Sequence, residues 1–178
     1  MKERPMMFTG ATVQAILEGR KTQTRRIVKP QPLIGPCRSC LLMSPLGMPG
    51  EHIWVKETWA ETHKTKRTTA YVYRADDPEI KVKRWRSAMF MPRRASRINL
   101  EITDIRMERL QDVTDSDAKA EGIYLHSSHG LYNADHTKMW GGRTRVEGYR
   151  ALWDSLNEKR GFGWNKNPWV WVITFKRI

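Results

Sequence analysis

Short runs of alternating apolar and polar residues, separated by Gly and Pro, constrain the fold of this chain more than any other feature. Thr22–Val28, His52–Trp59 and Ala95–Ile102 have a period of two and are rich in β-branched or aromatic residues, which is typical of half-buried strands. Trp169–Arg177 is a longer run dense in Trp, Val and Ile. Because few of these runs are joined as βαβ units, we expect no doubly wound sheet. The pattern predicts an α+β fold: a small mixed β-barrel with peripheral helices and inserted loops.

Two helices are expected at opposite ends of the chain. The first begins near Thr9 or Thr12 and ends at Gly19, since Thr is a good N-cap and Gly a common C-terminal stop. The second covers 146–156, where Val, Tyr, Leu and Trp recur at helical spacing.

A third, shorter helix is expected after Thr114. Thr114 and Asp117 form a capping box in which Asp replaces the usual Glu or Gln. Gly122 stands where a C-terminal glycine belongs. Glu121 is therefore predicted to lie in the last turn of this helix.

The length of 178 residues favours one domain, 1–178. Three long segments interrupt the pattern of strands and helices, near 33–50, 60–94 and 124–145. Loops of this length in a compact domain are usually functional or mobile, so we interpret them as insertions. A smaller irregularity is expected at Asp104, where the alternation slips and indicates a bulge.

Neither a metal nor a cofactor is expected. Cys37 and Cys40 form a lone C-x-x-C, and no second Cys or His pair follows at the spacing of a structural zinc site. His52 or His63 would complete a site only through tertiary contacts, so reduced thiols are the simpler interpretation. The sequence shows no secretory signal and no apolar stretch of membrane-spanning length, so we expect a cytoplasmic protein that does not enter a membrane.

The net charge of +13 is concentrated in the first half of the chain. Residues 1–100 carry 20 basic and 8 acidic side chains, whereas 101–178 carry 12 and 11. The densest part, Lys64–Arg97, holds 11 basic residues and 3 acidic ones, with aromatic residues between them. Such a balance favours a polyanionic partner, nucleic acid first and acidic lipid second, although a basic surface can also serve solubility alone.

Four segments carry a resemblance to a known family. Gly19–Arg26 reads GRKTQTRR and resembles the G-x-K-x-x-T-x-R signature of the ASCH superfamily, whose fold is a PUA-like β-barrel. Pro49–Val55, with Glu51 in place of the commoner Asp, is similar to the family's turn into a barrel strand. Asp117–Ile123 and the closing run Trp169–Ile178 continue the resemblance in the same order. The sequence of these segments is also similar to that of a longer subgroup of the family found in phage and prophage genomes.

This resemblance implies several functions. The family includes amidohydrolases that deacylate N4-acetylcytidine, members reported as ribonucleases, and RNA-binding modules. In the amidohydrolases a Lys and a Thr of the signature act with a Glu of the short helix. Residue by residue, these correspond here to Lys21, Thr24 and Glu121.

Elementary chemistry is compatible with such a site. Thr24 can act as a nucleophile if Lys21 is neutral, and neighbouring arginines and burial lower the pKa of a lysine. Glu121 can orient the lysine or move a proton. Because residues three apart in a strand face opposite sides, Lys21 must lie in the turn after Gly19 rather than in the strand. If the protein is not an enzyme, Lys21 is a phosphate contact or an exposed charge, Thr24 is an ordinary strand residue, and Glu121 is a solvated helix end.

Further residues are candidates for binding nucleic acid. Basic side chains suit phosphates, and aromatic side chains stack on unpaired bases. The candidates are Arg26, Arg93, Arg94, Arg97, Trp85 and Tyr73. Glu57 is expected to face inward and to pair with Arg26 or Arg97.

Three functions therefore remain open. The leading one is an ASCH-type protein that binds RNA or a modified nucleoside in a basic cleft between Gly19–Arg26 and the helix carrying Glu121. The alternative is a hydrolase that uses this cleft, either an N4-acetylcytidine-type amidohydrolase or a ribonuclease. A phage interaction or assembly protein would account for the basic surface but not for the signature residues. No sequence pattern predicts an oligomeric state.

Overall fold

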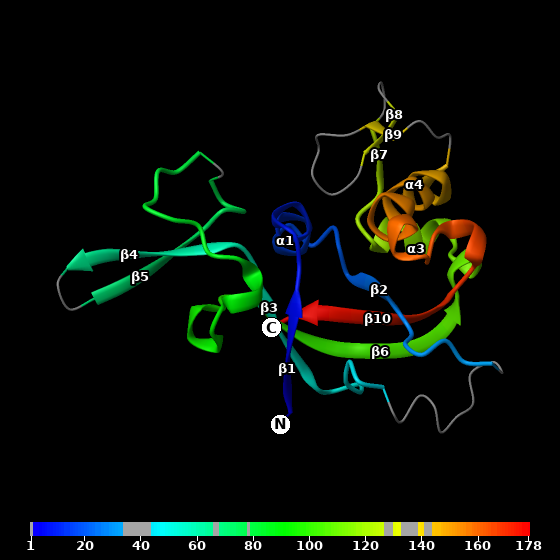
Figure 1. Ribbon diagram of the computed structural model, residues 1–178, viewed down its shortest axis with the longest axis horizontal. Helices are drawn as coiled ribbons and strands as arrows, with labels where there is room; N and C mark the ends of the chain where they lie inside the picture. Colours follow the sequence, from blue (N-terminus) through cyan, green and yellow to red (C-terminus); the bar gives the residue numbers. More distant parts are fainter. Residues whose placement is uncertain are drawn as a thin grey trace.

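A five-stranded mixed sheet forms the centre of the protein (Figure 1). The computed structural model describes residues 2–33, 44–65, 68–77, 79–126, 130–132, 139–140 and 144–178. The strand order is β1-β3-β6-β10-β2, with β1 and β3 parallel and the other neighbours antiparallel. The strands are β1 (Glu3–Met7), β2 (Gln23–Ile27), β3 (His52–Lys56), β6 (Asn99–Arg109) and β10 (Trp169–Arg177).

Helices cover both faces of this sheet. Helix α1 (Gly10–Leu17) packs on one face, while α3 (Asp115–Ala120) and α4 (Arg145–Asn157) pack on the other. Successive residues of β10 alternate between two apolar clusters: Ile173 packs with α1, and Val172 packs with α3 and α4. This alternation follows from the period of two in a strand.

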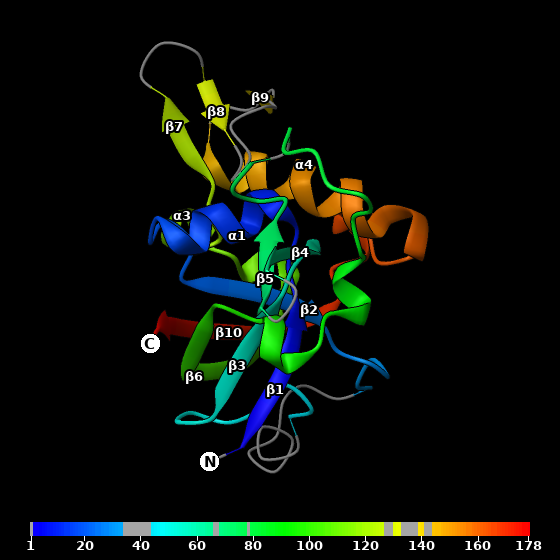
Figure 2. The same cartoon turned by 90° about the vertical axis from the view of Figure 1, so that its left-hand side faces the viewer.

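Two smaller sheets occupy the predicted insertions. The hairpin of β4 (Trp59–Thr65) and β5 (Thr68–Tyr73) projects away from the central sheet (Figures 1 and 2). Strands β7 (Tyr124–His126), β8 (Gly130–Tyr132) and β9 (Met139–Trp140) form a three-stranded sheet. The segments 60–94 and 124–145 therefore contain paired strands in addition to loops.

Single turns of 3₁₀ helix link the larger elements. They are η1 (Ala88–Phe90), η2 (Arg93–Ala95), η3 (Leu110–Asp112), η4 (Glu158–Arg160) and η5 (Trp164–Lys166).

The α+β class is confirmed, but the sheet is not closed into a barrel. Among the described residues its outer strands, β1 and β2, pair only with β3 and β10 and not with each other. Helix α1 connects these two strands and contributes Val13 and Ile16 to the cluster between them. A helix thus covers the core where a closed barrel would have a strand pair.

Most predicted elements are found close to their expected positions. Thr9 caps α1, and β10 has the predicted bounds. The predicted run Ala95–Ile102 begins later, at Asn99, because residues 93–95 form η2. The expected irregularity in β6 is present: Thr174 pairs with Asp104 and Phe175 with Ile102, so β6 carries one extra residue.

The region of the predicted strand His52–Trp59 is split in two. β3 ends at Lys56 and β4 begins at Trp59. Both Glu57 and Trp59 are nevertheless buried, as the predicted inward face requires.

The candidate cysteine pair, Cys37 and Cys40, lies outside the described residues. No helix in the described ranges is long and apolar enough to cross a membrane. The organisation as one domain with insertions stays a prediction.

Candidate functional site

Strand β2 presents its signature residues to two faces of the sheet. Arg25 pairs across the ladder with Val172 and donates to the Gln23 side-chain oxygen at 2.7 Å, so both residues face α3 and α4. Thr24 pairs with Ile173 and therefore belongs to the α1 face. This alternation is the one that the sequence predicts.

Lys21 lies in the turn before β2, as predicted. Gly19 adopts a positive φ of 73°, which glycine tolerates, and the chain then returns so that the Lys21 N–H donates to the Ala15 carbonyl at 3.0 Å. The Lys21 amine donates to Glu121 Oε2 at 2.5 Å and to the Glu121 carbonyl at 2.9 Å. The structure thus brings Lys21 and Glu121 together as a buried ion pair.

A capping box fixes the helix that carries Glu121. The Thr114 side chain accepts from the Asp117 N–H, and the Asp117 carboxylate accepts from the Thr114 N–H. Glu121 is the C-cap residue of α3, and its Oε1 accepts from Arg25 at 3.3 Å. Both oxygens of the Glu121 carboxylate are therefore held by cationic groups.

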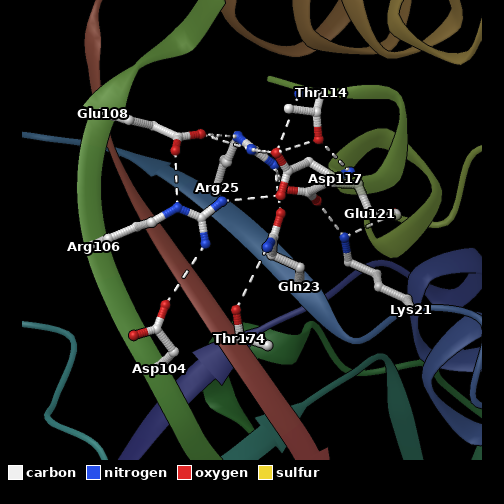
Figure 3. A network of polar contacts seen from close by, with 10 residues as sticks. All are labelled: Lys21, Gln23, Arg25, Asp104, Arg106, Glu108, Thr114, Asp117, Glu121 and Thr174. Carbon is white, nitrogen blue, oxygen red and sulfur yellow. Dashed lines mark hydrogen bonds and ion pairs between the residues drawn. The ribbon is translucent and has the colours of Figure 1, made fainter. Parts of the chain in front are cut away.

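A network of alternating charges extends from this pair to the surface (Figure 3). Arg25 contacts Glu108 at 2.7 Å and Asp117 at 3.3 Å. Arg106 contacts the same two carboxylates, each at 2.9 Å. The sequence did not predict this network. The signal for it was the period of two in β2, which places the charged side chain of Arg25 on an inward face. The network rigidly joins β2, β6 and α3.

Burial and neighbouring charges shift the pKa of several groups in this network, among them Lys21 and Asp117. Burial lowers the pKa of Lys21; the charge of Glu121 opposes this effect, and Arg26 and Arg25 add to it. For Asp117 burial raises the pKa, but hydrogen bonds from Thr114 and the charge of Arg25 outweigh it and lower the pKa to about 2. Asp117 is thus a carboxylate at all ordinary pH values, whereas the Lys21 amine is easier to deprotonate than an exposed lysine.

Arg26 is a half-buried cation without a counter-ion among the described residues. One terminal nitrogen donates to the Met7 carbonyl at 2.9 Å, and the guanidinium carbon lies 5.3 Å from the centre of the Phe8 ring. Its Nε is shielded from solvent and has no hydrogen-bond partner in the described part of the chain. Burial lowers the pKa of Arg26, and the charge of Glu121 partly opposes this. Arg26 is the signature residue with unused capacity to donate to an anion.

The structure does not join Thr24 to the pair of Lys21 and Glu121. Thr24 is buried, and within the described ranges no hydrogen bond to its hydroxyl is found. A pocket of about 270 Å³ lies next to Lys21, between the end of α1 and the end of β10. The residues lining this pocket come from 16–22 and 175–177, not from α3, so it is not the cleft predicted between Gly19–Arg26 and Glu121.

Solved structures of two bacterial proteins are similar to this chain. One is an ASCH domain from Lactobacillus crispatus JV V101, with 12% identity, a TM-score of 0.48, and coverage of 99% of this chain and 79% of that one. The other is a DUF984 protein from Enterococcus faecalis V583, with 12% identity, a TM-score of 0.45, and coverage of 100% and 77%. No protein-family model and no curated protein sequence matches the chain.

Two of the predicted phosphate-binding arginines lie on the surface near η2. Arg93 makes a bidentate ion pair with Glu3, at 2.8 and 3.0 Å, and also donates to Asn99. Arg94 is exposed and donates to the Tyr71 hydroxyl at 3.2 Å. Of the two, Arg94 retains more of its hydrogen-bonding capacity for a ligand.

Arg97 and Tyr73 are engaged with each other and with Glu57 at the base of the β4–β5 hairpin. Arg97 donates to both oxygens of Glu57, at 2.9 and 3.1 Å, which confirms the predicted pairing of Glu57. It also contacts Asp76 at 2.6 Å and lies 4.0 Å from the centre of the Tyr73 ring. Tyr73 donates to the Ala95 carbonyl. These contacts join the hairpin to the segment that leads into β6.

Trp85 lies apart from these arginines, in a groove of about 870 Å³ beside β4. The groove is lined by Glu61, Thr62, Lys83, Arg84, Trp85, Arg86, Ser87 and Phe90. The sequence did not indicate Lys83 or Arg84 individually as binding residues, although both lie in the basic and aromatic segment Lys64–Arg97.

No group of three or more His, Cys, Asp or Glu side chains with the arrangement of a metal site occurs within the ranges that the structure describes.

Proposed function

We propose that this protein is an ASCH-type module that binds RNA through β2 and the turn before it, with a phosphate of the ligand at Arg26. The observation that carries this proposal is the missing counter-ion of Arg26, a half-buried cation, in the described part of the chain. Burying a cation costs free energy unless an anion or hydrogen-bond acceptors compensate it. A phosphate supplies both, because guanidinium groups bind phosphate oxygens through several N–H donors.

The neighbouring charges support a positioning role for the network around Glu121. Lys21 and Arg25 occupy both oxygens of the Glu121 carboxylate. The carboxylate therefore holds the turn before β2 close to α3, and Arg26 is the cation of β2 that has no ion pair with any described residue. The net positive charge of residues 1–100, the half of the chain that contains β2, would attract a polyanion.

A hydrolase is the second candidate, and the burial of Lys21 favours it. Because burial lowers the pKa of the amine, a larger fraction of Lys21 is neutral than for an exposed lysine. A neutral amine can accept the proton of a nucleophile, for which Thr24 remains the candidate. In this reaction N4-acetylcytidine and water would give cytidine and acetate.

One pair of assays tests both candidates. The purified protein is mixed with a labelled single-stranded RNA and, separately, with N4-acetylcytidine, and both assays are repeated with Lys21→Met and Thr24→Val. For the binding function we expect RNA affinity that falls as salt rises and no release of acetate. Acetate release that is lost in both variants would establish the hydrolase, while release unaffected by either variant would exclude the proposed residues.

RNA affinity that is insensitive to salt would contradict phosphate recognition at Arg26. Arg26→Gln tests this contact. Its matched control is Arg150→Gln, which removes an exposed arginine of α4 whose contacts are with Asp154 and Asn165.

A further inference from the structure

The groove beside β4 has a wall that the backbone holds in place. Trp59 and Arg86 form a two-way bridge, in which the Arg86 N–H donates at 2.8 Å and the Trp59 N–H donates at 3.2 Å. The Arg86 side chain lies 5.0 Å from the centre of the Trp59 ring and pairs with Glu61 at 3.1 Å. These contacts fix the segment 83–87 alongside β4, so the groove is formed in the free protein.

Two cations of the groove are available to a ligand. Lys83 and Arg84 are exposed and have no ion pair with any residue that the structure describes. Glu61 is an acidic residue of the lining, and Arg86 already neutralises it. In the segment 79–90 there are four basic residues and one acidic residue. The groove therefore carries net positive charge that no described carboxylate compensates.

Aromatic surface lies next to these cations. Trp85 is half-buried in the lining, and Phe90 on η1 is 74% exposed. A large exposed aromatic side chain at the edge of a concave surface is typical of a binding site, because it leaves apolar area in contact with water until a partner covers it. Flat aromatic side chains beside lysine and arginine are the combination that binds unpaired bases and their phosphates.

We propose that this groove binds single-stranded RNA, with phosphates at Lys83 and Arg84 and a base stacked on Trp85 or Phe90. The volume of about 870 Å³ lies toward the upper end of the range of ligand pockets, so it can hold more than one nucleotide. The concave shape suits a strand better than the broad surface of a membrane. The hydroxyls of Thr62 and Ser87 also line the groove and are suited to contact a ribose 2′-hydroxyl.

This groove is separate from the site at β2. In Figure 1 the β4–β5 hairpin projects to one side of the central sheet, whereas β2, the edge strand that carries Arg26, lies toward the other side. The proposal therefore does not depend on the function of Arg26, and the two can fail independently.

The test uses the full chain and fluorescence anisotropy with labelled oligouridine RNA. Trp85→Ala and Phe90→Ala are compared with wild type, and we expect at least one of them to weaken binding about tenfold, as the loss of one stacked base does. The double variant Lys83→Gln/Arg84→Gln should reduce the slope of log affinity against log salt by about 0.7 for each phosphate that the protein no longer neutralises. Trp85→Phe keeps an aromatic ring and should retain most of the affinity.

Two controls keep the result specific. Lys159→Gln/Lys166→Gln removes two exposed positive charges from η4 and η5 and should leave affinity and salt slope near those of wild type. An abasic ribose-phosphate oligomer carries the same charge without bases and should bind about tenfold more weakly than RNA if stacking contributes. Circular dichroism of each variant excludes unfolding as the cause of a weaker affinity.

Several outcomes would overturn the proposal. Equal binding of RNA and the abasic oligomer would exclude base stacking, and equal binding of DNA of the same sequence would exclude the ribose contact. Binding to anionic lipid vesicles that competes with RNA and is lost in Trp85→Ala would assign the groove to a membrane instead. If Arg26→Gln abolishes binding while all groove variants bind like wild type, the groove has no role and the site at β2 stands; the reverse pattern supports the groove alone.

Discussion

The Lys21 amine and the Glu121 carboxylate lie 2.5 Å apart although 100 residues separate them in the chain. Their side chains are only 6% and 5% exposed, so this ion pair is buried. It joins the turn after α1 to the C-terminal end of α3 and is itself bound to Arg25. The position of the signature segment, Gly19–Arg26, relative to α3 therefore depends on these buried charges. Removing one of them alone should destabilise the fold.

The first prediction concerns the coupling of this pair. Glu121→Gln leaves two buried cations without their shared carboxylate and should lower the free energy of unfolding by about 3 to 5 kcal/mol. Lys21→Met should cost less, because Arg25 still compensates Glu121. The double variant Lys21→Met/Glu121→Gln should be more stable than the sum of the single losses predicts. Urea denaturation of the four proteins measures this, and additive losses would show that the pair is not coupled.

The second prediction concerns acid stability. The pKa of Asp117 falls from 3.8 to about 2 in the folded state, so its carboxylate stabilises the fold above the pKa of the unfolded chain. This stabilisation is complete above about pH 4 and is lost as the pH falls toward 2. The difference in unfolding free energy between wild type and Asp117→Asn should be constant near neutral pH and should shrink below about pH 4. A difference that is unchanged through this range would contradict the shifted pKa.

The third prediction concerns the base of the β4–β5 hairpin. Burial raises the pKa of Glu57, and the hydrogen bonds from Arg97 oppose this. Arg97→Met removes the opposing effect, so the pKa of Glu57 rises further. An acid with a raised pKa in the folded state makes the fold less stable as the pH rises, so the variant should be destabilised more near pH 8 than near pH 5. The loss at pH 8, where the buried carboxylate is charged, should be about 3 to 5 kcal/mol.

Arg94→Met is the matched control for this prediction, since Arg94 is exposed and contacts the Tyr71 hydroxyl. Its unfolding free energy should change little and equally at both pH values. The same pH dependence in both variants would show that Glu57 is not its source.

The sequence was sufficient to predict the elements that depend on local pattern. The run 169–177 is dense in Trp, Val and Ile and became β10 with the predicted bounds, and the capping box of Thr114 and Asp117 is formed. The period of two in 22–28 predicts that Arg25 and Gln23 share one face, as they do. It also predicts that Lys21 lies in the turn before the strand, and β2 indeed begins at Gln23. These features follow from a few neighbouring residues.

The rest depended on contacts between distant segments. Nothing local indicates that Arg106 and Arg25 share the carboxylates of Glu108 and Asp117, because β2, β6 and α3 must first be assembled. The open sheet likewise follows from the packing of α1, which a strand pattern does not contain. The insertions formed small sheets because pairing, rather than their mixed composition, decides their structure.

Arg26 is proposed to bind a phosphate of the ligand, and Arg26→Gln removes this contact alone. Arg26→Gln removes a half-buried cation that has no counter-ion among the described residues, so the thermal midpoint of unfolding should stay the same or rise. The affinity for labelled single-stranded RNA, measured by fluorescence anisotropy, should fall about tenfold, while Arg150→Gln should bind like wild type. RNA affinity in Arg26→Gln equal to that of wild type would contradict the account.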